Sequence, residues 1–138
     1  MPQRQMSEVI RRAPVVMPPE ASVQEACAAM HRQRIGAVVV VGPERDPLGI
    51  FTGRDAARML AEGRDPASTR LRDAMTPDPA CMHPPRTAID ALRLMHDGGF
   101  RHLPLVEGGC VVGVVSHGDF RAVQHARLDE ETGIWERI

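Results

Sequence analysis

Apolar residues follow the same succession of spacings twice along this chain. In each half they first recur three or four positions apart, as on one face of a helix, and then gather in two short runs. The helical stripes are Val23, Ala26, Cys27 and Met30, and then Ala88, Ala91, Leu92 and Met95. The apolar runs are 37–41 and 48–51, and then 103–106 and 110–115. Each half is therefore predicted to hold a helix followed by two strands that are buried on both faces.

Prolines and polar residues set the limits of these elements. Capping boxes start both helical stripes, at Ser22 and at Thr87. Proline favours extended backbone before it, so a short extended segment is expected ahead of each helix. Turn-rich segments join the strands as hairpins, and a second helix closes each half. The extended segments are 15–17 and 80–82, the turns 42–47 and 107–109, and the closing helices 55–62 and 119–127. The predicted fold is mixed α/β (α+β), with a β-α-β-β-α unit used twice.

The two halves also match residue by residue, which indicates one structural unit used twice. Pro14, Met17, Pro19 and His31 align with Pro79, Met82, Pro84 and His96. Both halves end in the signature Gly-apolar-apolar-Ser/Thr-x-x-Asp, at 49–55 and 113–119. The predicted organisation is a first repeat over 7–63, a linker over 64–70, a second repeat over 71–127 and a C-terminal tail over 128–138. Units this small are marginal alone, so we expect them to pack with pseudo-two-fold symmetry around a ligand cleft.

The composition argues against some classes of ligand and indicates a cellular location. A net charge of −1 argues against a nucleic-acid binder, and three Phe and one Trp offer no platform for stacking bases. All 17 basic residues are arginine, which together with abundant Pro and Ala indicates the coding bias of a GC-rich bacterium. The three cysteines form no Cys-x-x-Cys pair, and no apolar run is long enough to span a bilayer. We therefore predict a cytoplasmic bacterial protein that makes no membrane contact.

The Ser/Thr-x-x-Asp part of the signature has two interpretations. In the first, Thr52 with Asp55, and Ser116 with Asp119, are capping boxes that satisfy the free N–H groups of a helix start. In the second, the helix start presents N–H donors to an anion, the hydroxyl joins them, and the Asp accepts hydrogen bonds from a ribose diol. The residues alone leave both interpretations open.

The histidines do not indicate a metal site or a catalytic centre. None of the six stands at a His-x-x-x-His or Glu-x-x-His spacing. Ser116 and His117 are neighbours at a strand end, so their side chains are expected to face apart, and there is no nucleophile elbow. We therefore predict a non-enzymatic protein with no metal and no required cofactor. A small hydrolase that uses His117 and Asp119 is kept as an alternative.

The paired signatures, the segment 100–106 and the helix residues up to Met30 and Met95 resemble a tandem pair of cystathionine-β-synthase (CBS) domains. The resemblance implies a regulatory sensor of energy or redox state. Such a protein binds AMP, ADP, ATP, NAD(H) or S-adenosylmethionine between its repeats, with the Asp on the ribose and the Ser/Thr near the phosphate. The resemblance also implies a homodimer assembled through its helices, and a protein target that responds to the bound ligand.

The two repeats differ at one informative place. Gly36 and Ala37 stand where the second repeat has Arg101 and His102. Arginine suits bidentate contact with phosphate, and the resemblance directs this pair toward the phosphates of a nucleotide held by Asp119. The Asp119 cleft is therefore expected to be the better anion site. Adenine is expected to rest on the apolar residues Val16, Met17, Cys81 and Met82. The main alternative function is a structural interaction module with an empty cleft.

Overall fold

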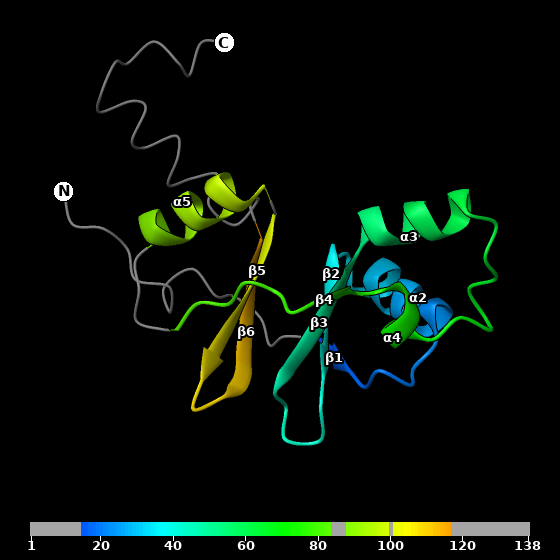
Figure 1. Ribbon diagram of the computed structural model, residues 1–138, viewed down its shortest axis with the longest axis horizontal. Coiled ribbons are helices and arrows are strands. Elements are labelled where there is room, and N and C mark those ends of the chain that lie inside the picture. Colours follow the sequence, from blue (N-terminus) through cyan, green and yellow to red (C-terminus); the bar gives the residue numbers. More distant parts are fainter. Residues whose placement is uncertain (1–14, 84–87, 100, 117–138) are drawn as a thin grey trace, which may run out of the picture.

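Two β-sheets lie side by side in the middle of the molecule, with helices on their outer sides (Figure 1). The computed structural model describes residues 15–83, 88–99 and 101–116. In chain order the elements are β1 (Val16–Met17), α2 (Val23–Gln33), β2 (Ala37–Val41), β3 (Pro47–Thr52), α3 (Gly53–Ala61), α4 (Leu71–Ala74), β4 (Thr76–Pro77), α5 (Ala88–Gly98), β5 (His102–Glu107) and β6 (Cys110–Ser116). The first sheet has the strand order β1-β2-β3-β4, and the second pairs β5 with β6. The predicted mixed α+β fold is confirmed.

The strand pairing recurs from one half to the other in the same register. Both hairpins, β2–β3 and β5–β6, are antiparallel. The matching pairs are Ala37 with Thr52 and His102 with Ser116, and then Val40 with Gly49 and Leu105 with Gly113. Each ladder shifts its register immediately after the second of these pairs. The extended segment before the helix makes the same pairing in both halves. Met17 pairs in parallel with Val40, and Met82 pairs in parallel with Leu105. The sequence repeat is thus also a structural repeat.

The helix α2 starts at the capping box that the sequence predicts. The Glu25 N–H donates to Ser22 Oγ at 3.0 Å, and the Ser22 N–H donates to Glu25 Oε2 at 3.2 Å. The helix ends at Arg34, whose φ of 55° is the left-handed conformation common after a last helical turn. Its apolar stripe packs on the first sheet, where Val23 and Ala26 are fully buried.

Each half has its own apolar core between helix and sheet. The first core comprises Val23, Ala26, Val38, Val40, Phe51, Met59, Leu71 and Ala74. The second comprises Met82, Ala91, Met95, Leu103, Leu105 and Val115. Every residue of β2 is buried, as predicted. The same prediction is wrong for β6, where Val112 is 40% exposed. Val112 is the extra residue at the register shift of this ladder, because Leu105 pairs with Gly113 and Val106 with Val111, so that Val112 has no partner across the ladder.

The segment that follows the predicted linker contains two elements that the apolar pattern does not reveal. α4 is a single turn and β4 has two residues. Both pack on the first half, because β4 pairs with β3 and α4 contacts α2 and α3. We call residues 71–77 the connector, which Figure 1 shows in green passing from α4 across β3. The first residues of the predicted second repeat therefore pack with the first half, and two of them, Thr76 and Pro77, form a strand of the first sheet.

Several predicted features lie outside the described residues. They are the cap at Thr87, the helix over 119–127 with Asp119, the neighbouring His117, and the tail over 128–138. Within the ranges that the structure describes, no helix is long and apolar enough to cross a membrane.

Candidate functional site

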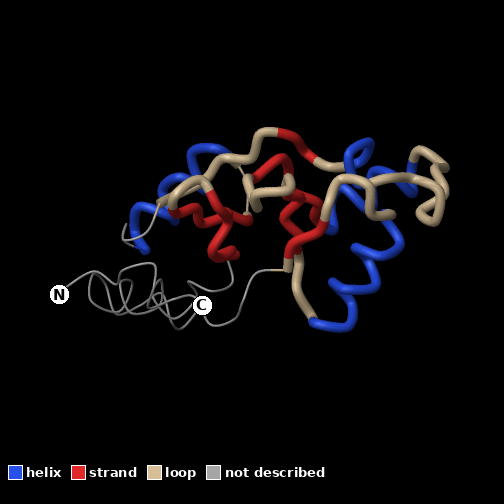
Figure 2. Tube along the Cα trace, turned by 90° about the horizontal axis from the view of Figure 1, so that it is seen from below, coloured by secondary structure: helices blue, strands red, loops and turns tan. Residues whose placement is uncertain are grey.

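Valine side chains from both sheets meet at the seam between the two halves. Val39 and Val41 of β2 pack there with Val106 and Val111 of the second sheet. Figure 2 shows the strands gathered in the middle and the helices at either end. The partly buried residues beside this valine cluster are Val16, Cys81 and Val114. The middle of the seam is apolar, and the polar groups able to orient a ligand that the structure describes lie toward its ends.

One end of the seam is closed by the hairpin turn of the first half. The Val111 N–H donates to the Arg45 carbonyl oxygen at 2.9 Å, and Cys110 Sγ donates to the Glu44 carbonyl oxygen at 3.3 Å. Both Nε and Nη2 of Arg45 lie 3.4 Å from the Val111 carbonyl oxygen. These contacts tie the halves together at the end of the strands opposite to the signature residues Thr52 and Ser116.

The repeats also meet at the signature end, through Gly36 and His102. A Cβ placed on Gly36 would lie 2.8 Å from His102 Nε2, so any side chain at position 36 would displace the imidazole from its present place. His102 stands opposite Ser116 across the β5–β6 ladder, and the adjacent Arg101 is exposed. The structure thus brings three predicted site residues to one end of the second sheet. Gly36, which stands in the first repeat where the second has the charged Arg101, leaves space for the ring of His102.

Asp55 caps the helix α3. The helix begins at Gly53, earlier than predicted, because Thr52 is its N-cap. The Asp55 N–H donates to Thr52 Oγ1 at 3.4 Å, and the Thr52 N–H donates to Asp55 Oδ2 at 2.9 Å. Capping is therefore present in the first repeat, whereas the ribose role of Asp55 stays a prediction.

The Asp55 carboxylate also has partners outside its capping box. The Thr52 hydroxyl donates to Oδ2 at 3.1 Å, and the Thr76 hydroxyl of the connector donates to Oδ1 at 3.0 Å. Arg58 Nη2 lies 3.3 Å from the same Oδ1. Asp55 is only 4% exposed as a result. The sequence could not indicate Thr76 as a partner, because it lies beyond the repeat that contains Asp55.

Gly49, the first residue of the signature, lies where the connector comes closest to β3. A Cβ on Gly49 would collide with the side chain of Met75 and approach the Thr76 carbonyl oxygen to 2.9 Å. The glycine is therefore needed for the connector to pack. This requirement is the one signal in the sequence that could have revealed the pairing of β4 with β3.

The four residues predicted to hold adenine fall into two pairs. Val16 and Cys81 flank the valine cluster at the seam, whereas Met17 and Met82 pack into the cores of their own halves. Alternation along an extended segment explains the division. Burial raises the pKa of the Cys81 thiol, and it does the same for Cys27. Of these four residues, Val16 and Cys81 therefore lie beside the seam, whereas Met17 and Met82 do not.

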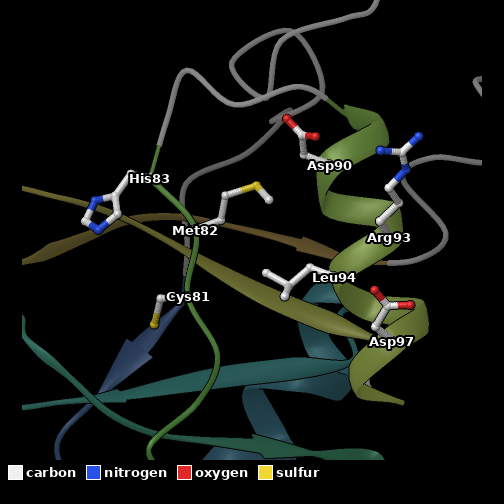
Figure 3. Close-up of a pocket in the computed structure, with 7 residues that line it drawn as sticks. All are labelled: Cys81, Met82, His83, Asp90, Arg93, Leu94 and Asp97. Atoms are coloured by element: carbon white, nitrogen blue, oxygen red, sulfur yellow. The ribbon is translucent and has the colours of Figure 1, made fainter.

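A separate groove of about 330 Å³ runs between the segment around Met82 and the helix α5. Its walls are Cys81, Met82, His83, Asp90, Arg93, Leu94 and Asp97. Leu94 points toward Met82, while Asp90, Arg93 and Asp97 lie along the helix (Figure 3). In the described part of the chain, no three His, Cys, Asp or Glu side chains come together as a metal site requires. None of Arg101, His102 or Ser116 lines this groove.

The model of the CBS domain family matches the chain twice, over residues 6–62 and 71–126. The chain belongs to the CBS domain family. The two structural halves correspond to the two CBS matches, and the second match begins with the connector. The resemblance that the paired signatures suggest is confirmed, and the molecule is a CBS pair.

Similar proteins come from plants, bacteria and archaea. The mitochondrial CBS domain-containing protein CBSX3 of Arabidopsis thaliana is 36% identical over 115 residues, which are 79% of this chain and 56% of that protein. The CBS-domain containing protein ATU1752 of Agrobacterium tumefaciens is 34% identical, with a TM-score of 0.72 over 84% of this chain and 90% of that one. The CBS domain protein PAE2072 of Pyrobaculum aerophilum, solved in complex with AMP, is 24% identical, with a TM-score of 0.81 over 88% of this chain and 96% of that one. This chain spans little more than half of CBSX3.

Proposed function

We propose that this CBS pair is a non-enzymatic regulatory module that binds an adenosyl ligand at the seam, in the cleft of Asp119. The observation that carries the proposal is the grouping at one end of the second sheet. There an exposed Arg101, a half-buried His102 and the hydroxyl of Ser116 stand at the end of an apolar seam. Apolar walls with a few polar groups at one end suit a ligand that has a flat base and a charged phosphate.

Each residue has a role in this proposal. Arg101 contacts phosphate, and His102 and Ser116 complete the set of polar groups around it. Asp119 accepts hydrogen bonds from the ribose diol, as acidic residues do in dinucleotide-binding folds. Val16 and Cys81 provide the apolar surface for adenine. The complex of PAE2072 with AMP supports AMP as the first ligand to test. ADP, ATP, NAD(H) and S-adenosylmethionine carry the same adenosyl group.

We also propose that the protein is a homodimer whose state of ligation is read by a protein target. The proposal follows the family resemblance, and Leu60 on α3, which is 63% exposed, is the position at which a helix-mediated interface can be tested. Sedimentation should show a dimer for the wild type and a monomer for Leu60→Asp. A wild type that stays monomeric at tens of micromolar would rule out the dimer.

The experiment that tests the function is a titration with defined ligands. Wild type, Asp119→Ala and Glu107→Ala are titrated calorimetrically with AMP, ATP, NADH and S-adenosylmethionine. Glu107→Ala is the matched control. It also removes one carboxylate, but at the end of β5 that is farther from Arg101 and His102. Loss of a buried hydrogen-bonding group costs about 1–3 kcal/mol, so Asp119→Ala should weaken binding by roughly five- to a hundredfold. Thermal unfolding must show that Asp119→Ala is folded.

The same experiment separates the alternative functions. Failure of the folded wild type to bind any of the four compounds would favour a structural interaction module with an empty cleft. Conversion of a bound nucleotide, followed by chromatography, would favour the hydrolase. Mass spectrometry of small molecules released from the purified protein would identify a ligand that the titration omits.

A further inference from the structure

Three hydrogen bonds and one ion pair leave the Asp55 carboxylate too little free capacity to accept two further hydrogen bonds. A carboxylate offers about four lone-pair positions. Thr52 fills two of them through its N–H and its hydroxyl. Thr76 donates its hydroxyl to the third at 3.0 Å, and Arg58 Nη2 lies 3.3 Å from the same oxygen. A ribose diol needs two acceptor positions, so it cannot bind Asp55 while Thr76 and Arg58 stay in place.

The two groups at Oδ1, the Thr76 hydroxyl and the Arg58 guanidinium, both take part in attaching the connector. Thr76 is part of β4, which pairs with β3 through Ile50. Arg58 also donates through Nη2 to the carbonyl oxygen of Ala74 at 2.8 Å, and Ala74 is the last residue of α4. Asp55 and Arg58 therefore hold the connector at two points from adjacent turns of α3. In the second repeat the position of Arg58 is taken by Ala122, so this anchor is particular to the first repeat.

The connector leads directly into the second half. The Met82 N–H donates to the Pro104 carbonyl oxygen at 3.0 Å, and the Val106 N–H donates to the Met82 carbonyl oxygen at 2.9 Å. Only residues 78–81 lie between β4 and this attachment. A displacement of Thr76 from Asp55 therefore acts on the second sheet through a very short length of chain.

We propose that the Asp55–Thr76 contact is a latch that closes the ligand cleft expected at Asp55, called the first cleft here, and competes with an adenosyl ligand for the same carboxylate. In the closed state the connector lies on β3, and a ribose diol cannot bind in the first cleft because the Asp55 carboxylate is already occupied. A ligand that binds Asp55 must displace the Thr76 hydroxyl and so release the connector. The inference rests on the proposed function for its ligand, whereas the latch itself can be measured without one.

The latch is tested first in the absence of ligand, with Thr76→Val and its matched control Thr76→Ser. Valine keeps the shape of threonine and removes the donor, whereas serine keeps the hydroxyl. A hydrogen bond to a charged group is strong enough that its loss should speed exchange of the β3–β4 amides about tenfold. The amide of Asp78, which donates to the Leu48 carbonyl oxygen at 3.1 Å, reports on this pairing. Equal exchange in Thr76→Val and Thr76→Ser would overturn the latch.

The competition is tested with AMP in proteins that also carry Asp119→Ala, so that the first cleft is measured alone. Thr76→Val should bind AMP about tenfold more tightly than Thr76→Ser, because the ligand no longer displaces a hydroxyl. AMP should also speed exchange of the Val106 amide. Equal affinities in the two variants would overturn the competition. Absence of AMP binding in every protein, the wild type included, would instead refute the proposed function, and the exchange data would still decide whether the latch exists.

Discussion

His102 Nε2 lies only 2.8 Å from the point that a Cβ on Gly36 would occupy. Gly36 directly precedes β2 and His102 is the first residue of β5, so the starts of the two matching strands meet at the signature end. The absence of a side chain at position 36 is thus a condition for the position of His102.

Gly36→Ala should move the His102 ring. The added methyl group forces the imidazole away from its rotamer, which costs about 0.5–1.5 kcal/mol. The free energy of unfolding, measured in urea, should fall by that amount, and the imidazole signals of His102 should shift in NMR spectra. In a His102→Ala background the same substitution should cost almost nothing, because no ring is left to displace. A cost that persists in that background would show that Gly36 is needed for another reason.

Gly49→Ala should destabilise the first half strongly, because the new methyl group meets Met75 and the Thr76 backbone. Overpacking of this kind costs about 1–3 kcal/mol. Gly53→Ala is the matched control, since a Cβ there has no atom within 4 Å and the residue opens a helix. That control should be neutral or more stable by up to about 1 kcal/mol. Similar losses in the two variants would contradict the role given to Gly49.

Arg101→Ala should weaken AMP binding far more than adenosine binding. A charge-assisted contact with phosphate contributes roughly 1.5–3 kcal/mol, which is about ten- to a hundredfold in affinity. Calorimetry in low and high salt should show a weaker salt dependence for the variant, because part of the attraction is screened. Arg93→Ala removes an exposed arginine from α5 and should leave both affinities unchanged. An equal loss for AMP and adenosine in Arg101→Ala would mean that Arg101 supports the shape of the cleft instead.

Bound AMP should protect Cys81 from alkylation and leave Cys27 unaffected. Burial raises the pKa of both thiols, so each holds less thiolate at pH 8 than free cysteine does. Without ligand, both should react more slowly than glutathione with iodoacetamide, and the rates should rise as the pH is increased above 8. Cys81 lies beside the seam and Cys27 lies in the first half, away from it. Mass spectrometry of the labelled peptides gives both rates, and protection of both thiols or of neither would place adenine elsewhere.

The sequence predicts those parts of the fold that depend on local pattern. The limits of β2, the capping boxes at Ser22 and Thr52 and both hairpins follow from apolar runs, caps and turn residues. The exposure of Val112 in β6 is not predicted, because a run of apolar residues does not reveal where the strand ladder shifts its register.

The connector could not be predicted in the same way. α4 is one turn long and shows no helical period, and β4 is too short to stand out as a strand. The same limit applies to the candidate site. The Asp55 carboxylate accepts a hydrogen bond from Thr76, and the position of the His102 ring depends on the missing side chain at Gly36. Both features arise from contacts between distant parts of the chain. Local patterns identified the residues, but not their partners.

The pairing of Thr76 with Ile50 bears on whether a single copy of the repeat can stand alone. The edge of β3 in one copy is covered by the leading segment of the next copy. A protein with a single copy would lack this leading segment of the next copy, and the edge of β3 would be open to a strand from another chain. For the same reason, a fragment cut within 64–70 would expose the edge at Gly49 and Ile50. A fragment cut after Pro79 would keep it covered.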